Sequence, residues 1–197
     1  MKHILQEKEK QVELFDIVDD KGIPTGETVE RAEAHEKDIL HRTAHVWVVK
    51  MKEGRPQVLL QKRAAGKDSF PGCYDTSSAG HIRAGYEPLD SALRELGEEL
   101  GIKASERDLS FAGIFHSHYE KIFYEKPFRD NEVTFVYIYD RPVDIESLTL
   151  QEEEVESVRW FDADHVREKI EPPRDERFCV PREGFSLVLE WIKAKVH

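Results

Sequence analysis

Cysteine, long apolar runs and net positive charge are what this chain has least of. Only two of its 197 residues are cysteines, Cys73 and Cys179, and no CxxC pair occurs. This count excludes a disulfide framework and predicts reduced thiols in a cytoplasmic protein. The N-terminus lacks the apolar run of a signal peptide, and no segment approaches the roughly 20 apolar residues that span a bilayer. We therefore expect no membrane partner.

The shortage of positive charge narrows the class of ligand. Forty acidic residues against 29 lysines and arginines give a formal net charge of −11. A protein this acidic is poorly suited to a nucleic acid polymer or to an anionic membrane surface. A small phosphorylated ligand remains compatible with this charge, because metal ions can neutralise phosphate locally.

Residues 88–100 carry the clearest periodic pattern in the chain. Apolar residues recur there at helical spacing and predict one buried stripe: Leu89, Leu93, Leu96 and Leu100. Pro88 suits a first helical position, and Gly101 suits the residue just past a helix end. The pattern therefore predicts a helix over 88–100.

The other side of this predicted helix is acidic. Glu95, Glu98 and Glu99 are spaced i, i+3, i+4, which places three carboxylates on one face. Mg²⁺ prefers oxygen ligands, so glutamates on a rigid helix can hold it. Taken alone, the same three residues also fit a solvated acidic face, and the spacing does not choose between the two interpretations.

The rest of the chain alternates between strands, loops and two further helices. Strands are predicted at 12–19, 25–29, 45–50, 58–63, 109–120, 132–140 and 155–161. Helices are predicted at 163–170, capped by Asp162, and at 185–195, whereas 64–77 and 123–131 have loop composition. This order predicts an α/β fold, with a mixed sheet between helices and an N-terminal β-hairpin extension. Strand histidines are interpreted as core or edge residues: His45, His116 and His118.

Residues 80–102 resemble the Nudix box, G-x5-E-x7-R-E-U-x-E-E-x-G-U with U aliphatic. Gly80 matches its first glycine and RELGEELGI its second half, while its first glutamate falls on Tyr86. The resemblance implies a Nudix-type α/β/α sandwich and cleavage of a diphosphate linkage with Mg²⁺ or Mn²⁺. It assigns Glu95, Glu98 and Glu99 as metal ligands and Arg94 as the residue that orients a glutamate. Glu98 is the first choice as general base, with Glu120 and Glu132 as alternatives.

Several separate places resemble type 1 isopentenyl-diphosphate isomerases, which share the Nudix fold. The resemblance implies a second divalent metal such as Mn²⁺ or Zn²⁺, held by imidazoles and carboxylates: His35, His41, His81, Asp130 and Glu132. It also assigns Arg63 and Lys67 to the substrate diphosphate. The isomerase mechanism needs a cysteine where this chain has Ala79, and the isomerases lose most of the box glutamates that are kept here. The balance favours a hydrolase with isomerase-like binding features.

Together these patterns predict one Nudix domain over 1–197, with an N-terminal extension at 1–40, a core at 41–170 and a C-terminal helix region at 171–197. The expected activity is metal-dependent hydrolysis of a nucleoside diphosphate derivative or a related small diphosphate. Two alternatives stay open: an isopentenyl-diphosphate isomerase-like enzyme, and a module that binds a diphosphate without turnover. The sequence also leaves open whether the chain forms a homodimer.

Overall fold

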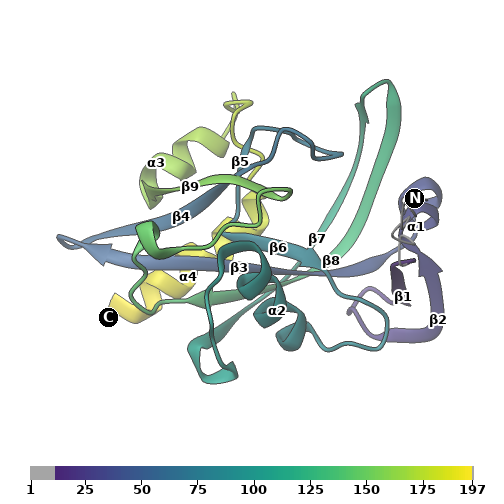
Figure 1. Ribbon diagram of the computed structural model, residues 1–197, viewed down its shortest axis with the longest axis horizontal. Helices are drawn as coiled ribbons and strands as arrows, with labels where there is room; N and C mark the ends of the chain where they lie inside the picture. Colours follow the sequence, from purple (N-terminus) through teal and green to yellow (C-terminus); the bar gives the residue numbers. More distant parts are fainter. Residues whose placement is uncertain (1–11, 197) are drawn as a thin grey trace, which may run out of the picture.

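The computed structural model describes residues 12–196, which form a mixed sheet between helices (Figure 1). An N-terminal hairpin of β1 (Leu14–Val18) and β2 (Pro24–Glu30) leads into α1 (Arg31–Lys37). The main sheet contains β3 (His41–Lys52), β4 (Arg55–Arg63), β5 (Tyr74–Asp75), β6 (Ser78–His81), β7 (Leu109–Phe123), β8 (Lys126–Tyr139) and β9 (Val155–Asp162). The other helices are α2 (Pro88–Leu100), α3 (Ala163–Ile170) and α4 (Arg182–Val196), with short 3-10 turns at Glu106–Asp108 and Ile145–Ser147.

Strand β3 is the centre of the sheet. It pairs with β8 in parallel and with β4 and β6 in antiparallel fashion. On one side β4 also pairs with β5 and β9, and on the other β7 pairs with β8. Helices α2 and α4 lie on opposite faces of this sheet (Figure 1). No helix within residues 12–196 has the length and apolarity that crossing a membrane requires.

Two buried clusters hold the layers together, and alternation along β3 explains both. Successive strand residues point to opposite faces of a sheet. Val46 and Val48 pack in the cluster that contains the α2 leucines, whereas Trp47 and Val49 pack in the cluster that contains α4. Burial on both faces makes the middle of β3 almost continuously apolar, as expected of a central strand.

The helix predicted over 88–100 is confirmed, because α2 has these bounds and ends at Gly101 in the left-handed conformation with φ 70°. The α/β sandwich with an N-terminal hairpin is also confirmed. The hairpin forms its own two-stranded sheet. It contacts the loop between β6 and α2 through a bridge between Phe15 and Arg83. Helix α1 was not anticipated from the sequence.

The prediction of a loop over 123–131 was wrong. Strands β7 and β8 continue through it as a long two-stranded arm that projects from the body of the molecule (Figure 1). Only Tyr124 and Glu125 turn the chain, both with positive φ. Aromatic pairs across the arm, Tyr119 with Phe128 and Phe123 with Phe128, give these charged strands an apolar contact that composition alone does not reveal.

Candidate active site and metal cluster

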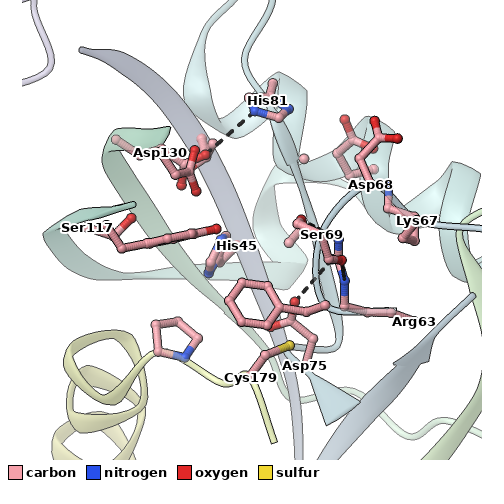
Figure 2. Close-up of a pocket in the computed structure, with 18 of the residues that line it drawn as sticks. His45, Arg63, Lys67, Asp68, Ser69, Asp75, His81, Ser117, Asp130 and Cys179 are labelled. Atoms are coloured by element: carbon pink, nitrogen blue, oxygen red, sulfur yellow. Dashed lines mark hydrogen bonds and ion pairs between the residues drawn. The ribbon is translucent and has the colours of Figure 1, made fainter. Parts of the chain in front are cut away.

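One pocket of about 690 Å³ gathers nearly every residue singled out in the sequence. It lies beside the N-terminal end of α4 and is lined by strands β3, β6, β7 and β8, by α2 and by the loop at 64–73. Figure 2 shows His45, Arg63 and Asp75 pointing toward its centre, with Ser117 and Cys179 at its wall. The pocket therefore joins the box helix to residues that lie far from it in the sequence.

The glycine that opens the box makes room for a box glutamate. A Cβ atom built on Gly80 would overlap the Glu95 carboxyl group and lie 2.6 Å from its Cγ. Real Cβ atoms do not approach a neighbour this closely, so a side chain at this position must displace Glu95. The absence of a side chain at Gly80 thus lets α2 pack its acidic face against β6.

Arg94 binds two of the box glutamates. Its Nη2 lies 2.6 Å from Oε1 of Glu95, and its Nη1 lies 2.9 Å from Oε2 of Glu98. The same Nη2 donates to the main-chain carbonyl of His81 at 3.2 Å. The guanidinium thereby links both carboxylates to the main chain of β6.

Glu99 is the buried member of the acidic face, with 4% of its surface exposed. Its Oε2 accepts hydrogen bonds from the main-chain N–H of Ala79 at 3.1 Å and from Nε2 of Gln61 at 3.4 Å. Burial raises the pKa of Glu99 to about 8, and burial also raises the pKa of Glu95. A nearby cation would favour the ionised form of both groups, so these residues fit a divalent metal.

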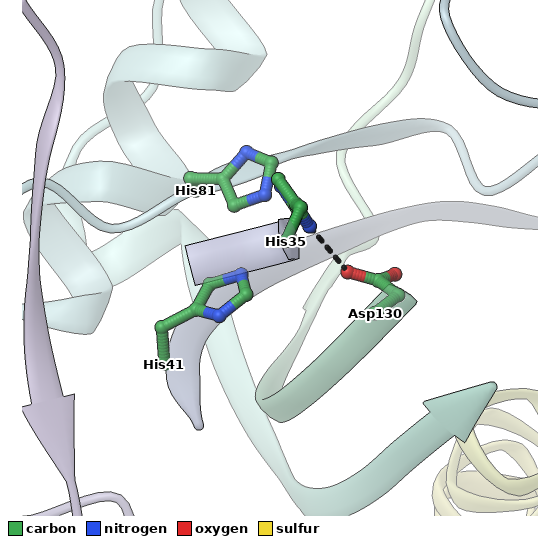
Figure 3. Close-up of side chains that lie close together, drawn as sticks. All are labelled: His35, His41, His81 and Asp130. Atoms are coloured by element: carbon green, nitrogen blue, oxygen red, sulfur yellow. Dashed lines mark ion pairs between the residues drawn. The ribbon is translucent and has the colours of Figure 1, made fainter. Parts of the chain in front are cut away.

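Three histidines and an aspartate form a tighter cluster (Figure 3). One ligand atom from each of four elements lies within 4.8 Å of all the others: His35 on α1, His41 at the start of β3, His81 at the end of β6, and Asp130 on β8. Glu132 adjoins them, with its Oε1 3.8 Å from His41 Nε2 and 3.6 Å from His81 Nε2. Across the described residues the box glutamates do not form so compact a group.

Hydrogen bonds set the tautomers in this cluster. Nδ1 of His35 lies 2.9 Å from the Arg129 carbonyl, and Nδ1 of His41 lies 2.8 Å from the Ile39 carbonyl. A carbonyl can only accept, so each Nδ1 carries the proton and leaves an Nε2 lone pair. Both Nε2 atoms are buried and have no hydrogen-bond partner, like Nε2 of His81 and Oδ1 of Asp130. Outer hydrogen bonds of this kind are typical of metal-binding histidines.

The charge states of the cluster agree with its geometry. Burial lowers the pKa of His41 and the pKa of His81, which keeps both imidazoles neutral near pH 7. Burial, with Asp130 as the next cause, raises the pKa of Glu132. Neutral imidazole is the form that binds a metal, and a cation would remove the cost of ionising the carboxylates. The donor set fits a divalent transition metal.

The N-terminal hairpin completes this cluster from outside. The Phe15 ring stacks on His41 at 4.9 Å and on His81 at 4.6 Å between centroids. Oδ2 of Asp16 accepts from the main-chain N–H of Gly85 at 2.9 Å and from Arg42 Nη2 at 2.8 Å. The hairpin therefore covers the histidines with an apolar ring and is hydrogen-bonded to the loop that precedes α2.

The basic residues assigned to substrate lie in the pocket wall in ion pairs of their own. Arg63 Nη1 lies 3.2 Å from Oδ2 of Asp75, and its Nε donates to the Ser69 carbonyl at 3.0 Å. Lys67 pairs with Glu154. Tyr86, at the position of the missing box glutamate, is 52% exposed and is not among the pocket-lining residues.

His45 is a pocket residue that the sequence interpretation passed over. It follows His41 and Thr43 on one face of β3, and its Nδ1 is buried without a partner. Desolvation lowers its pKa to about 4, so the imidazole is neutral at pH 7. His116 and His118 also line the pocket, although His118 is largely exposed and pairs with Asp38. Alternate residues of a strand point to the same face, so His45 shares a face with His41. This alternation could have identified His45 from the sequence.

A family model described as the NUDIX domain matches residues 40–179. The chain belongs to the Nudix family. It is 41% identical over 157 residues to Nudix hydrolase 3 of Arabidopsis thaliana, a match that covers 79% of this chain but only 20% of that protein. It is 38% identical over 187 residues to an uncharacterized Nudix hydrolase of Clostridium acetobutylicum, covering 93% of this chain and 88% of that one.

Isomerases are also among the relatives of this Nudix chain. An isopentenyl-diphosphate Delta-isomerase of Cereibacter sphaeroides is 33% identical over 155 residues, with 76% of this chain and 78% of that one covered. The NUDIX domain of Shewanella oneidensis NrtR shares the fold, with a TM-score of 0.55 at 14% identity over 86% of this chain and 100% of that one. His35 precedes the matched range, so the histidine cluster includes a residue from outside the Nudix domain as the family model defines it.

Proposed function

We propose that this Nudix chain is a metal-dependent hydrolase of a diphosphate linkage in a nucleoside diphosphate derivative or a related small diphosphate. One observation carries the proposal: the box carboxylates and two basic side chains line the same pocket. Glu95, Glu98 and Glu99 supply the oxygen ligands that Mg²⁺ and Mn²⁺ prefer, and Arg63 and Lys67 supply charge for phosphate oxygens. A pocket with both charges suits an anionic substrate that arrives with a cation.

Glu95 and Glu99 are the residues that we assign to hold the cation, with Glu98 as a further ligand. A bound Mg²⁺ or Mn²⁺ would offset charge on the phosphates and lower the pKa of an attacking water. The side chain of Glu95 is 13% exposed and Glu99 is buried. Few water molecules can therefore reach these two carboxylates and compete with them for the cation. Arg94 would position Glu95 and Glu98 through its two ion pairs.

Glu98 is our assignment for the general base. Its side chain is 50% exposed and lies in the pocket, so it can accept a proton from a water that attacks phosphorus and pass that proton to solvent. The leaving phosphate or phosphate ester would depart toward Lys67 and Arg63.

We assign the second divalent metal to His35, His41, His81, Asp130 and Glu132. Imidazole nitrogen with carboxylate oxygen favours Mn²⁺ or Zn²⁺ over Mg²⁺. The buried and unpartnered Nε2 atoms support this assignment, because an isolated buried polar atom is costly unless it finds a partner.

A phosphate-release assay tests the proposal. The purified protein is incubated with nucleoside diphosphate derivatives and with isopentenyl diphosphate, in the presence of Mg²⁺ or Mn²⁺, and the products are treated with a phosphatase or pyrophosphatase. We expect phosphate release that EDTA abolishes and that Glu98→Gln loses. An activity that survives both treatments would contradict the assignment of the box.

A second candidate function is isomerisation of isopentenyl diphosphate, which the isomerase relatives and the histidine cluster favour. An isomerase-like enzyme would incorporate deuterium from solvent into isopentenyl diphosphate without releasing phosphate. Ala79 stands against this function, because a methyl group cannot move a proton. Tight diphosphate binding with no product of either kind would instead favour a binding module.

A further inference from the structure

The floor of the pocket is one face of the sheet, and the strand register fixes which side chains lie on it. Directly paired residues of neighbouring strands point to the same face. Thr43 pairs with Thr134 of β8, and His45 pairs with Val136 of β8 and with Ala79 of β6. The hydroxyl oxygens of Thr43 and Thr134 lie 2.9 Å apart, so this part of the floor is polar.

His45 lies where this polar floor meets the apolar core. Two residues further along β3, Trp47 packs against Phe185 of α4 with 5.4 Å between the ring centroids. Phe115 of β7 meets the His45 ring edge-on at a centroid distance of 5.8 Å. Trp47 and Phe115 are buried, whereas His45 is half-buried and lines the pocket. Helix α4 therefore covers the apolar part of this face, and the pocket begins at the imidazole.

The two ring nitrogens of His45 differ in their surroundings. Nδ1 is enclosed and has no hydrogen-bond partner among residues 12–196, whereas Nε2 is not enclosed in this way, and the ring points into the pocket (Figure 2). Burial lowers the pKa of His45 to about 4, so the imidazole is neutral at pH 7 and carries one proton. That proton belongs on Nε2, because only there can water or a ligand accept it.

We propose that His45 is a specificity-determining residue that donates a hydrogen bond to an uncharged oxygen of the substrate, such as a sugar hydroxyl. This inference rests on the proposed function, because it concerns the part of the substrate beyond the diphosphate. Phosphate oxygens are better matched by the charged side chains of Arg63 and Lys67, and the floor next to His45 carries the Glu132 carboxyl group, 3.1 Å from Oγ1 of Thr43. A hydrocarbon chain at this place would leave the imidazole N–H without a partner, so the expected substrate is a diphosphate that bears a sugar.

Steady-state kinetics of the full-length protein with two substrates of different chemistry tests the proposal. ADP-ribose carries sugar hydroxyls beside its diphosphate, whereas isopentenyl diphosphate carries only a hydrocarbon. With saturating Mg²⁺, kcat/KM of the wild type should be at least about 10-fold higher for ADP-ribose. His45→Leu should lower the ADP-ribose value by at least about 10-fold, mainly through KM, and should reduce this preference. His45→Gln keeps a donor and should recover part of it, and His165→Leu, at an exposed position of α3, should keep both values.

An equal fractional loss for both substrates in His45→Leu would overturn the proposal, because a purely structural residue affects both alike. So would a wild-type preference for isopentenyl diphosphate, a result that needs no variant to fold. If the wild type cleaves neither substrate, the proposed hydrolysis fails, and calorimetric titration with ADP-ribose then tests His45 separately. Binding to His45→Leu that is at least about 10-fold weaker than to the wild type supports the inference. Unchanged binding, or no binding to the wild type, contradicts it.

Discussion

Two regions of the site contain carboxylates: the acidic face of α2 and the histidine cluster. They differ in whether their charged and polar atoms have partners within the protein. On α2, Arg94 already neutralises Glu95 and Glu98 at 2.6 and 2.9 Å. In the histidine cluster, three Nε2 atoms and Oδ1 of Asp130 are buried with no hydrogen-bond partner. The first region therefore has internal partners for its carboxylates, whereas the second leaves four buried ligand atoms unpartnered, which a cation would satisfy.

This difference predicts different metal occupancy. Ligands that are already close together and desolvated lose little freedom on binding, so the histidine cluster should retain its ion through purification. On the glutamate face a cation shares Glu95 and Glu98 with Arg94, so it should bind more weakly and arrive with the substrate. The following predictions test this contrast, beginning with the largest expected effect.

Glu98→Gln should reduce turnover by on the order of 10²- to 10⁴-fold, because a general base typically contributes that much. The substitution keeps the size of the side chain and leaves the pocket otherwise intact. Steady-state kinetics with saturating Mg²⁺ measures the effect, and Glu168→Gln, on the exposed face of α3, is the matched control. Turnover within about 3-fold of wild type would remove Glu98 from the base role.

His41→Ala should weaken metal retention at the cluster by at least 10- to 100-fold, since even the loss of an outer-shell partner costs that much. Elemental analysis after gel filtration measures the bound metal. Glu98→Gln should keep the wild-type stoichiometry, because it lies in the other region. Equal loss of metal in both variants would mean that the two regions are one site.

Gly80→Ala should lower turnover by roughly 10-fold, because its Cβ displaces the Glu95 carboxyl group. Gly66→Ala is the control, since a Cβ there meets no atom within 4 Å. Circular dichroism should show both variants folded. If Gly80→Ala keeps full activity, the position of Glu95 is not critical to the reaction.

The contrast between the two regions also explains what the sequence could reveal. Glu95, Glu98 and Glu99 belong to one helix, so the period of 3.6 alone places them on one face. The cluster joins α1, β3, β6 and β8, and their meeting depends on strand pairing such as His41 with Glu132, which no local pattern encodes. Only the resemblance to a family identified those residues before the structure did.

Other features depended on contacts that composition hides. The hairpin was predicted from alternation, but its function in covering His41 and His81 with Phe15 was not, because that contact links segments distant in sequence. Residues 123–131, at the tip of the arm of β7 and β8, were interpreted as a loop because they are rich in charged and aromatic residues. Its strands persist because aromatic side chains pair across them.

His45 gives the last and smallest prediction, because it is a half-buried imidazole in the same pocket but outside the histidine cluster. Desolvation lowers its pKa to about 4, against the opposing effect of Asp75 and Asp130, with Arg63 lowering it further. The unfolded chain, with a histidine pKa near 6.5, therefore binds more protons than the folded chain between pH 6.5 and 4. Stability should be full above pH 6.5 and fall with acid across that window.

Between pH 6.5 and 5.5, His45 alone should account for roughly 1 kcal/mol of this loss. Urea unfolding of wild type and His45→Gln at both pH values, with the cluster held in the same metal buffer, measures the difference. His165→Gln, at an exposed position on α3, should keep the wild-type slope. An unchanged slope in His45→Gln would show that acid sensitivity resides in groups other than His45.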